Sequence, residues 1–486
     1  MCGSFLVLPH LVMLYFKLPY ILYRDYPEFG YLTDNRNFGY DTASRSCIKV
    51  GDRILSKTGS IFYSVLTERP QTVDDLSRKI ASMFVGVSVS EVKTDAEAFF
   101  EELAKDGFVG AGERVPLSVD CFSYADKHRR DLPQEEYHAK KDETFSNYWG
   151  AQCHLSRVHL EVSGRCNEHC VHCYFPDSFN KSVMTRELFL SILEQCKACN
   201  VLSITISGGE PMLNPDLLFF INECRKNNFS VNLLSNLTLL SEDMLRVFSG
   251  TPLFGIQTSL YSMVPEVHDS ITRVKGSFEK TKRAIEKLHE YNIPMQINCP
   301  VIKHNKNTYQ DVLDWASNLN IEASSDYLVF GCFDGSGVNL RCRLELSEIE
   351  SIIREGHQGE KKESNLGQGN GNYTICPVCI SSLCISHAGD IYPCEGWQSY
   401  ILGNVKNTPL KKIWEESKEI QALRDLSYDD FPKCRNCVDK DFCSICLLRN
   451  ANESRTGSYK EVNPYFCRVA RVKRAIAAND VGNAAI

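Results

Sequence analysis

The sequence predicts an α/β protein whose centre is a parallel sheet, with a small α+β domain before it and a cysteine-rich domain after it. Three observations lead to this prediction. Apolar strands alternate with amphipathic helices from 157 to 330, three short strands precede three helices between 20 and 109, and a dense cysteine field begins at Cys376. Alternation of strands and helices is typical of parallel sheets joined by right-handed crossovers.

Length and composition limit the possible classes of protein. The 486 residues are enough for roughly three domains, and 43% hydrophobic residues can form packed cores. A net charge of −7 without a prominent basic run argues against nucleic acid as a partner. The 22 cysteines occur in a chain too large to need disulfides for its stability, and their short spacings favour metal binding in a reducing cytoplasm.

The first 23 residues are apolar, but Pro9, His10, Lys17 and Pro19 interrupt them. The stretch is too broken to span a membrane, and it has neither the basic start nor the cleavage pattern of a signal peptide. We therefore expect it to belong to a folded domain of a soluble, cytoplasmic protein with no membrane partner.

The N-terminal region reads as strands followed by helices. Strands are predicted at 20–24, 31–33 and 47–50, and helices at 60–66, 72–83 and 92–103. Thr72 is placed to cap the second helix, and Gly107 to end the third.

The phrases SKTGSIFYSVL, TVDDLSRKIA and FFEELAKDGFV in this region resemble the PqqD-like leader-binding domains of peptide-modifying systems, so a small winged-helix-like α+β domain is expected here. The resemblance implies that a precursor peptide's leader adds a strand beside the third predicted strand and packs along the third helix. A DNA-binding winged helix and a domain that only packs are the alternatives. The acidic residues on the helices weigh against DNA: Asp74, Asp75, Glu97, Glu101 and Glu102.

The central region contains six strand and helix units. Its strands are predicted at 158–162, 202–206, 231–234, 253–259, 295–299 and 327–330, and its helices at 187–198, 215–226, 242–248, 278–289 and 308–317. In barrels of such units, ligands gather at the carboxyl ends of the strands.

A cysteine motif, Cys166-Asn-Glu-His-Cys170-Val-His-Cys173, directly follows the first of these strands. Three thiolates on so short a loop suit three corners of a [4Fe–4S] cube better than one tetrahedral zinc. The fourth iron then lacks a protein ligand, and a small molecule with an amine and a carboxylate could chelate it. A zinc knuckle or scattered buried cysteines are the alternatives.

A second motif, Ser207-Gly208-Gly209-Glu210-Pro211, ends the second strand, and together the two motifs resemble the radical S-adenosylmethionine (SAM) superfamily with its open (β/α)6 barrel. The resemblance implies that the three cysteines bind a [4Fe–4S] cluster and that SAM fills the open iron. Reduction then yields a 5′-deoxyadenosyl radical that removes an unactivated hydrogen.

The same resemblance implies contacts to SAM. Gly208 and Gly209 let the backbone approach its amine, and Glu210 contacts its cationic end. Ser235, Asn236 and Ser259 match positions that meet its ribose or carboxylate.

The C-terminal cysteines follow the pattern C-x9-G-x4-C and then CxxCx5CxxC, which resembles the SPASM domain except that two residues instead of three separate Cys443 from Cys446. The resemblance implies two auxiliary [4Fe–4S] clusters, for three in all. One would use Cys376, Cys379, Cys394 and Cys446, and the other Cys434, Cys437, Cys443 and Cys467. Cys384 is left over, the first cluster has an open iron if Cys376 does not bind, and a zinc ribbon is the alternative.

Glu395 directly follows Cys394, where sulfatase-maturating relatives carry an acidic residue that acts as a base. A carboxylate there could take the substrate's proton. The alternative is an ordinary solvated glutamate.

The resemblance implies a radical SAM/SPASM enzyme that modifies a ribosomally made precursor peptide, most readily by a Cys thioether crosslink, with a reductant such as flavodoxin or ferredoxin. Carbon–carbon crosslinking, epimerisation, sulfatase maturation to formylglycine, and a non-enzymatic iron–sulfur peptide sensor are the alternatives. The expected domains are leader recognition at 1–110, a linker at 111–152, the barrel at 153–331, a bridging region at 332–375, the SPASM domain at 376–470 and a tail at 471–486.

Overall fold

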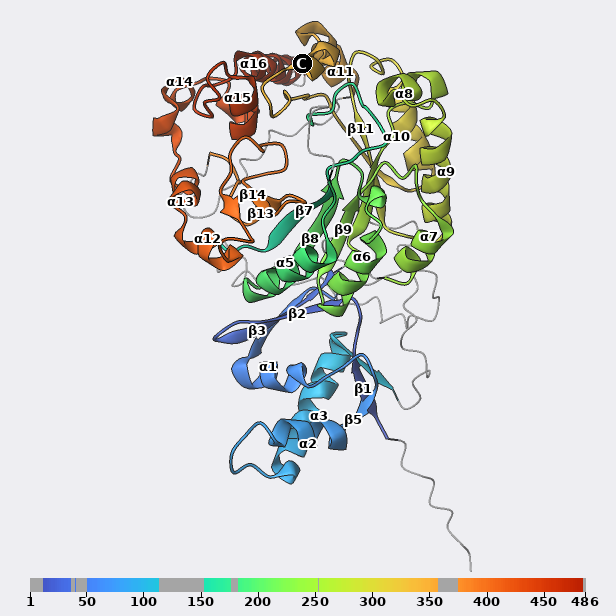
Figure 1. Ribbon diagram of the computed structural model, residues 1–486, viewed down its shortest axis with the longest axis vertical. Helices are drawn as coiled ribbons and strands as arrows, with labels where there is room; N and C mark the ends of the chain where they lie inside the picture. The colour runs from blue at the N-terminus through green and yellow to red at the C-terminus, as the bar shows by residue number, and fades with distance from the viewer. Residues whose placement is uncertain are drawn as a thin grey trace, which may run out of the picture. The chain divides into compact units, whose positions relative to one another are not determined.

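The computed structural model describes residues 12–35, 40, 50–112, 153–175, 182–251, 253–356 and 375–483 (Figure 1). Contacts divide the chain into two compact units. One consists chiefly of residues up to 112 and the other chiefly of residues from 153 onward.

The N-terminal unit contains two small antiparallel sheets. In the first, β3 (Phe29–Asp34) lies between β2 (Ile21–Asp25) and β4 (Asp52–Ser56). In the second, β1 (Leu14–Lys17) lies between β5 (Gln71–Thr72) and β6 (Val109–Gly112). The described part of the apolar N-terminal stretch is therefore part of a folded domain, as predicted.

Three helices complete this unit, and all three were predicted. They are α1 (Lys57–Ser64), α2 (Val73–Ala81) and α3 (Val89–Lys105). Thr72 caps α2, because its hydroxyl accepts a hydrogen bond from the backbone N–H of Asp75 at 3.1 Å. The helices and sheets share one core that includes the buried side chains of Tyr15, Leu76 and Phe100. This unit is α+β with strands before helices.

Two predictions for this unit need correction or fall outside it. The third strand was predicted at 47–50; residues 47–49 lie outside the described residues, Val50 is not in a strand, and the strand that pairs with β3 begins at Asp52. The predicted linker begins inside β6, and the rest of it up to 152 lies outside the described residues.

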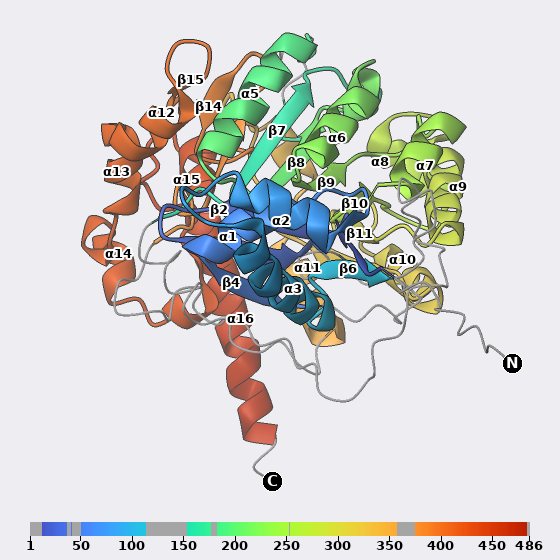
Figure 2. The ribbon, with the colours of Figure 1, turned by 90° about the horizontal axis from the view of Figure 1, so that it is seen from below.

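The larger unit is built on six parallel strands that pair in the order of the sequence. They are β7 (Arg157–Ser163), β8 (Ser203–Gly208), β9 (Ser230–Leu234), β10 (Gly255–Ser259), β11 (Met295–Pro300) and β12 (Glu322–Asp326). Helices cover one face of this sheet (Figures 1 and 2): α5 (Arg186–Ala198), α6 (Leu217–Lys226), α7 (Glu242–Ser249), α9 (Ser277–Glu290) and α10 (Tyr309–Asn318). The sheet does not close, so the predicted partial barrel is confirmed.

The strands carry apolar side chains on one face and polar side chains on the other. On β7, Val158 and Leu160 are buried on the face opposite to that of His159 and Glu161. On β8, Ile204 and Ile206 alternate with Thr205 and Ser207 in the same way. Since the apolar face must pack on the amphipathic helices, the polar face lines the inside of the barrel.

The sixth strand was predicted at 327–330, and this is wrong. The strand is Glu322–Asp326, which is mostly exposed because it lies at the edge of the sheet and pairs only with β11. The apolar run after it serves another purpose, since Val329 packs in a cluster with Tyr261 and Ile302. Polar edge strands carry little hydrophobic signal.

The cysteine-rich region extends the barrel sheet. Strand β13 (Ser382–Ile385) pairs in parallel with β7, and β14 (Asp390–Tyr392) and β15 (Gly403–Asn404) follow it in antiparallel order. Strands β13 and β14 therefore form an antiparallel hairpin with Gly389 in its turn. Figure 1 shows the helices of this region: α12 (Leu410–Glu416), α13 (Lys418–Arg424), α14 (Pro432–Arg435), α15 (Leu447–Glu453) and α16 (Pro464–Asn483).

Further elements lie between these regions. The helix α8 (Pro265–Thr272) follows β10, and α11 (Leu346–Gly356) lies in the predicted bridging region. Residues 471–483, expected as a tail, form most of α16.

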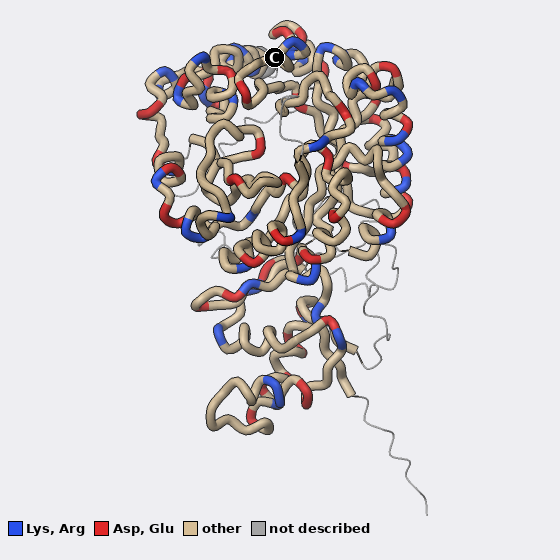
Figure 3. Tube along the Cα trace, in the orientation of Figure 1, with Lys and Arg blue, Asp and Glu red and all other residues tan. Residues whose placement is uncertain are grey.

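Figure 3 shows Lys and Arg interspersed with Asp and Glu along the outer helices. None of the helices in the described part of the chain is long and apolar enough to cross a membrane.

Candidate cluster and cofactor site

The cysteine loop leaves the carboxyl end of β7 and is fixed by backbone hydrogen bonds. The N–H of Cys173 donates to the carbonyl of Cys170 at 3.0 Å, and the N–H groups of His169 and Val171 donate to the carbonyls of Thr272 and Ile271 at 3.0 and 2.9 Å. The end of α8 therefore holds the loop in place. None of the three cysteines forms a disulfide, and all three follow the carboxyl end of β7, where the sequence places them.

The chemistry of the three thiols fits a metal cluster. Burial raises the pKa of Cys166 to about 12 and that of Cys170 well above its usual value. Thiolates are therefore unfavourable here unless a positive centre compensates them, as iron does. No three His, Cys, Asp or Glu side chains of the described residues converge on a single ion. A [4Fe–4S] cube, with an iron at each ligated corner, separates its sulfur ligands more widely than one ion does.

The two glycines after β8 lie directly against this loop. The N–H of Gly209 donates to the carbonyl of Ser163 at 2.8 Å, and that of Glu210 donates to the carbonyl of Arg165 at 2.7 Å. A Cβ atom on Gly208 would lie 2.2 Å from the Ser163 carbonyl oxygen, and one on Gly209 would lie 2.5 Å from that of Arg165. The glycines are thus required for backbone contact between the two motifs, a reason that the sequence did not reveal. Their approach to the SAM amine stays a prediction.

We expect Gly208→Ala to impair incorporation of the first cluster by several-fold, because the new Cβ meets backbone atoms that cannot move independently. Iron content and visible absorbance after anaerobic reconstitution measure this effect. Gly208 has a φ of +136°, so backbone strain alone could also affect the variant. Gly276→Ala is the matched control, because Gly276 also has a positive φ, +79°, but nothing lies within 4 Å of its added Cβ. Equal iron content in the two variants would contradict the steric argument.

Glu210 joins the ends of two strands. It is buried, and its carboxylate accepts hydrogen bonds from the N–H of Met212 at 2.9 Å, the hydroxyl of Ser235 at 2.7 Å and the N–H of Asn236 at 2.8 Å. Burial raises its pKa to about 7, and these donors oppose that rise. The structure thus brings together Glu210, Ser235 and Asn236, which were all predicted to contact SAM, and that contact stays a prediction.

Other residues around the cysteine loop were not predicted. The side chain of Asn236 donates to Asn167 at 2.8 Å, and Asn167 donates to Thr238 at 2.7 Å, so the loop that follows β9 is bonded to the cysteine loop. The hydroxyl of Tyr261 lies 3.8 Å from the sulfur of Cys170. Asn167 lies inside the motif and could have been noticed, whereas Tyr261 comes two residues after the predicted Ser259 at the end of β10.

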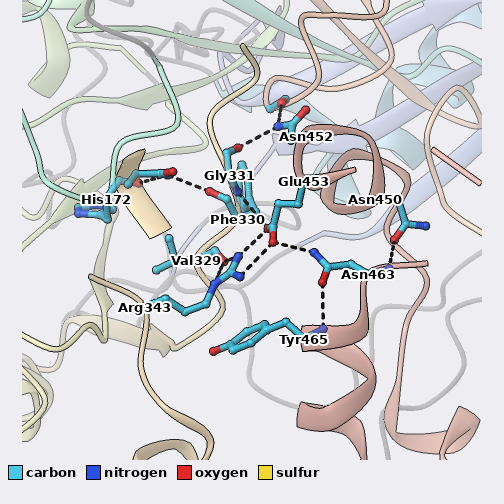
Figure 4. A network of polar contacts seen from close by, with 12 residues as sticks. His172, Val329, Phe330, Gly331, Arg343, Asn450, Asn452, Glu453, Asn463 and Tyr465 are labelled. Carbon is cyan, nitrogen blue, oxygen red and sulfur yellow. Dashed lines mark hydrogen bonds and ion pairs between the residues drawn. The ribbon is translucent and has the colours of Figure 1, made fainter. Parts of the chain in front are cut away.

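Figure 4 shows a polar network that links the bridging region to the SPASM region. The Arg343 guanidinium pairs with both carboxylate oxygens of Glu453 at 2.6 and 3.0 Å, and Glu453 also accepts from the N–H of Gly331. The side chain of Asn339 donates to the carbonyl of His172 at 3.1 Å. The network therefore extends from α15 to the cysteine loop.

The C-terminal cysteines form two groups in space. Burial raises the pKa of Cys394, and the nearby thiolates of Cys446 and Cys376 raise it further. The charge of Cys376 also raises the pKa of Cys379. In the second group, burial and then the charges of Cys467 and Cys437 raise the pKa of Cys434. Cys443 lies with Cys434 and Cys437 around Tyr428. The grouping agrees with the two predicted ligand sets, which remain predictions.

Glu395 is exposed, and its negative charge affects buried groups on and near β7. It raises the pKa values of His159, Glu161, Tyr174 and Cys384. The residue predicted as a base thus lies near buried side chains of β7. Its catalytic role stays a prediction.

These features define the class of protein. Residues 160–316 match the model of the radical SAM superfamily, and residues 376–438 match that of the SPASM iron–sulfur cluster-binding domain. The chain is an enzyme of the radical SAM type. It uses SAM and a [4Fe–4S] cluster, and its SPASM domain carries auxiliary iron–sulfur clusters.

Two curated relatives are about a quarter identical to this chain over the aligned residues. The AdoMet-dependent heme synthase of Methanosarcina barkeri is 25% identical over 63% of this chain and 94% of its own length. The PqqA peptide cyclase of Gluconobacter oxydans is 24% identical over 64% of this chain and 91% of its own length.

Solved structures share the fold. Streptococcus suis SuiB bound to the precursor peptide SuiA has a TM-score of 0.55 at 14% identity, over 92% of this chain and 98% of its own. Native anSMEcpe with bound AdoMet has a TM-score of 0.53 at 19% identity, over 68% of this chain and 99% of its own.

Proposed function

We propose that the protein modifies a ribosomally made precursor peptide and joins a Cys sulfur to a carbon of another residue as a thioether. The fold shared with SuiB, which was crystallised with a precursor peptide, and the similarity to PqqA peptide cyclase support a peptide substrate. The proposal assigns the N-terminal unit to leader recognition, as its PqqD-like phrases suggest.

The observation that carries the proposal is the position of β4 at the end of its sheet and beside α3. Among the described residues β4 pairs with β3 alone, so it is an edge strand of the described sheet, the kind of strand to which a peptide can add. Arg53 on β4 pairs with Asp106 after α3 at 3.0 Å and also with Glu102 on α3. A leader added to this edge would therefore run beside α3, which combines backbone pairing with side-chain contacts.

The roles of the chain's residues follow from this assignment. When bound, SAM and the iron–sulfur clusters supply hydrogen abstraction by a 5′-deoxyadenosyl radical and the accompanying electron transfer. Cys166, Cys170 and Cys173 would hold the SAM-binding cluster, and Glu210, Ser235, Asn236 and Ser259 would position SAM. Glu395 would accept the proton of the substrate thiol. A flavodoxin or ferredoxin in the cytoplasm would deliver the electron.

The test is anaerobic co-expression with a small, Cys-containing precursor encoded beside the gene, followed by mass spectrometry. We expect a loss of two hydrogens for each crosslink and the disappearance of one alkylatable thiol, because the sulfur becomes bonded to carbon. A precursor that lacks its leader should be modified far less. An unchanged mass with intact clusters would refute the proposal.

Carbon–carbon crosslinking is the second candidate, and the similarity to PqqA peptide cyclase favours it. It also removes two hydrogens, but every cysteine thiol would remain open to alkylation. Alkylation before fragmentation therefore separates the two reactions.

A further inference from the structure

A buried carboxylate on the inner face of the barrel has an oxygen without a partner. Glu161 on β7 is 1% exposed, and its Oε1 accepts a hydrogen bond from the Nε2 of Gln398 at 2.6 Å. Its Oε2 has no hydrogen-bond partner, and neither has the Oε1 of the buried Gln398. Two acceptors on a pair of hydrogen-bonded side chains thus lack partners, although buried polar atoms are normally paired because an unpaired one costs free energy.

The charged group that acts on Glu161 is also acidic. Among the described residues this group is Glu395, whose charge raises the pKa of Glu161 beyond the effect of burial. Burial lowers the pKa of His159, so its ring, bonded to the hydroxyl of Ser207, is neutral. In the described part of the chain, no Lys or Arg forms an ion pair with Glu161 or Glu395.

Burial raises the pKa of Glu161 to about 8, so near pH 7 this carboxyl is largely protonated unless a cation binds beside it, because an ionised carboxylate without a counter-charge has a high cost in this place. Packing alone does not explain a residue with such a cost, because an apolar residue of similar size would fill the space without it. A bound cation would supply the missing charge and donate to both free oxygens.

We propose that Glu161 and Gln398, with the charge of Glu395 beside them, form a subsite that binds a cationic side chain, Lys or Arg, of the peptide substrate. An ammonium or guanidinium group carries several N–H donors and no acceptor, which matches two free acceptors. An acidic side chain would meet only repulsion, and an apolar one would leave both acceptors unpaired.

The position of the subsite connects it to the reacting centre. Ser207 immediately precedes Gly208, and Tyr174 immediately follows Cys173, so the subsite adjoins both motifs of the SAM site. Glu395 and Gln398 come from the loop that follows β14 in the SPASM region. The inference rests on the proposed function, since it assumes a peptide substrate, and it adds that a basic residue of that peptide is anchored between the barrel and this loop.

The test uses four synthetic peptides, acetyl-Ala-Ala-Xaa-Ala-Ala-amide with Xaa as Lys, Arg, norleucine or Glu. Binding to the anaerobically purified full-length holoenzyme in the presence of SAM is measured by calorimetry. We expect the Lys or Arg peptide to bind about tenfold or more tightly than the norleucine peptide, and the Glu peptide to bind most weakly. The Lys and Arg peptides together show which cation the subsite prefers.

Glu161→Gln keeps the shape of the side chain but removes its charge, and we expect it to abolish the preference for the cationic peptides. Iron content checks that this variant retains its clusters. Glu322→Gln is the matched control, because Glu322 is an exposed carboxylate on β12 at the far edge of the same sheet, bonded to Gln296 at 2.7 Å. It should keep the preference.

Equal binding of the Lys and norleucine peptides, binding of none of the four at millimolar concentration, or an unchanged preference in Glu161→Gln would overturn the assignment. These outcomes concern binding only. They are therefore distinct from failure of the proposed function, which would appear as an unmodified precursor with intact clusters.

Discussion

Replacing Cys170 by alanine is expected to abolish reductive cleavage of SAM. The loop around Cys170 is fixed by hydrogen bonds to the end of α8, so no other thiol of the loop can move into its place. Losing one of three protein ligands should prevent stable assembly of the first cluster, and about four of about twelve irons should be lost. The measurements are 5′-deoxyadenosine released with SAM and dithionite, which should fall below detection, and iron per chain.

Cys199→Ala is the matched control for this prediction. Cys199 is a half-buried cysteine at the carboxyl end of α5 that forms no disulfide and belongs to none of the predicted ligand sets. It should retain full iron content and normal cleavage of SAM. If Cys170→Ala also retained both, the assignment of the CxxxCxxC loop to the cluster would be wrong.

Replacing Arg343 by methionine is expected to lower the free energy of unfolding by about 3–5 kcal/mol, because it leaves the Glu453 carboxylate buried without its counter-ion. Arg343 and Glu453 side chains are only 9% and 8% exposed. The guanidinium also donates to the carbonyl of Val329 at 2.9 Å and lies 4.2 Å from the ring centroid of Tyr465. Anaerobic denaturation in guanidinium chloride measures the change.

The double variant Arg343→Met with Glu453→Gln should recover a substantial part of this loss, since it removes the unpaired charge. Lys303→Met is the control for an exposed pair. The Lys303 and Glu345 side chains are 39% and 70% exposed, so breaking their ion pair should cost at most about 1 kcal/mol. If Arg343→Met lowered the free energy of unfolding no more than Lys303→Met does, the buried network would contribute little to stability.

The sequence predicted the parts of the fold whose signals are local. Five of the six barrel strands coincide with apolar runs, and helix boundaries such as that at Thr72 depend on a single capping side chain. The sixth strand was missed because an edge strand needs no apolar face, and Glu322–Asp326 has none. The third strand of the N-terminal unit was placed too early for a related reason, since Asp52 and Arg53 interrupt the apolar run.

The candidate site was predictable where its residues belong to motifs and not where they meet across the fold. Cys166, Gly208 and Glu210 stand in short patterns that carry chemical information. Arg343 and Glu453 lie 110 residues apart, and Glu161 and Gln398 lie 237 apart. Nothing local in the sequence shows that such residues touch, because the topology of the sheet brings them together.

The parallel pairing of β13 with β7 has a consequence for engineering. The edge of β7 that faces away from β8 is occupied by a strand that comes more than 200 residues later. A truncated protein that ends before β13 would expose this edge and invite intermolecular strand pairing and aggregation. Chimeras that exchange the C-terminal region between enzymes should therefore carry residues 382–385 as part of the recipient barrel.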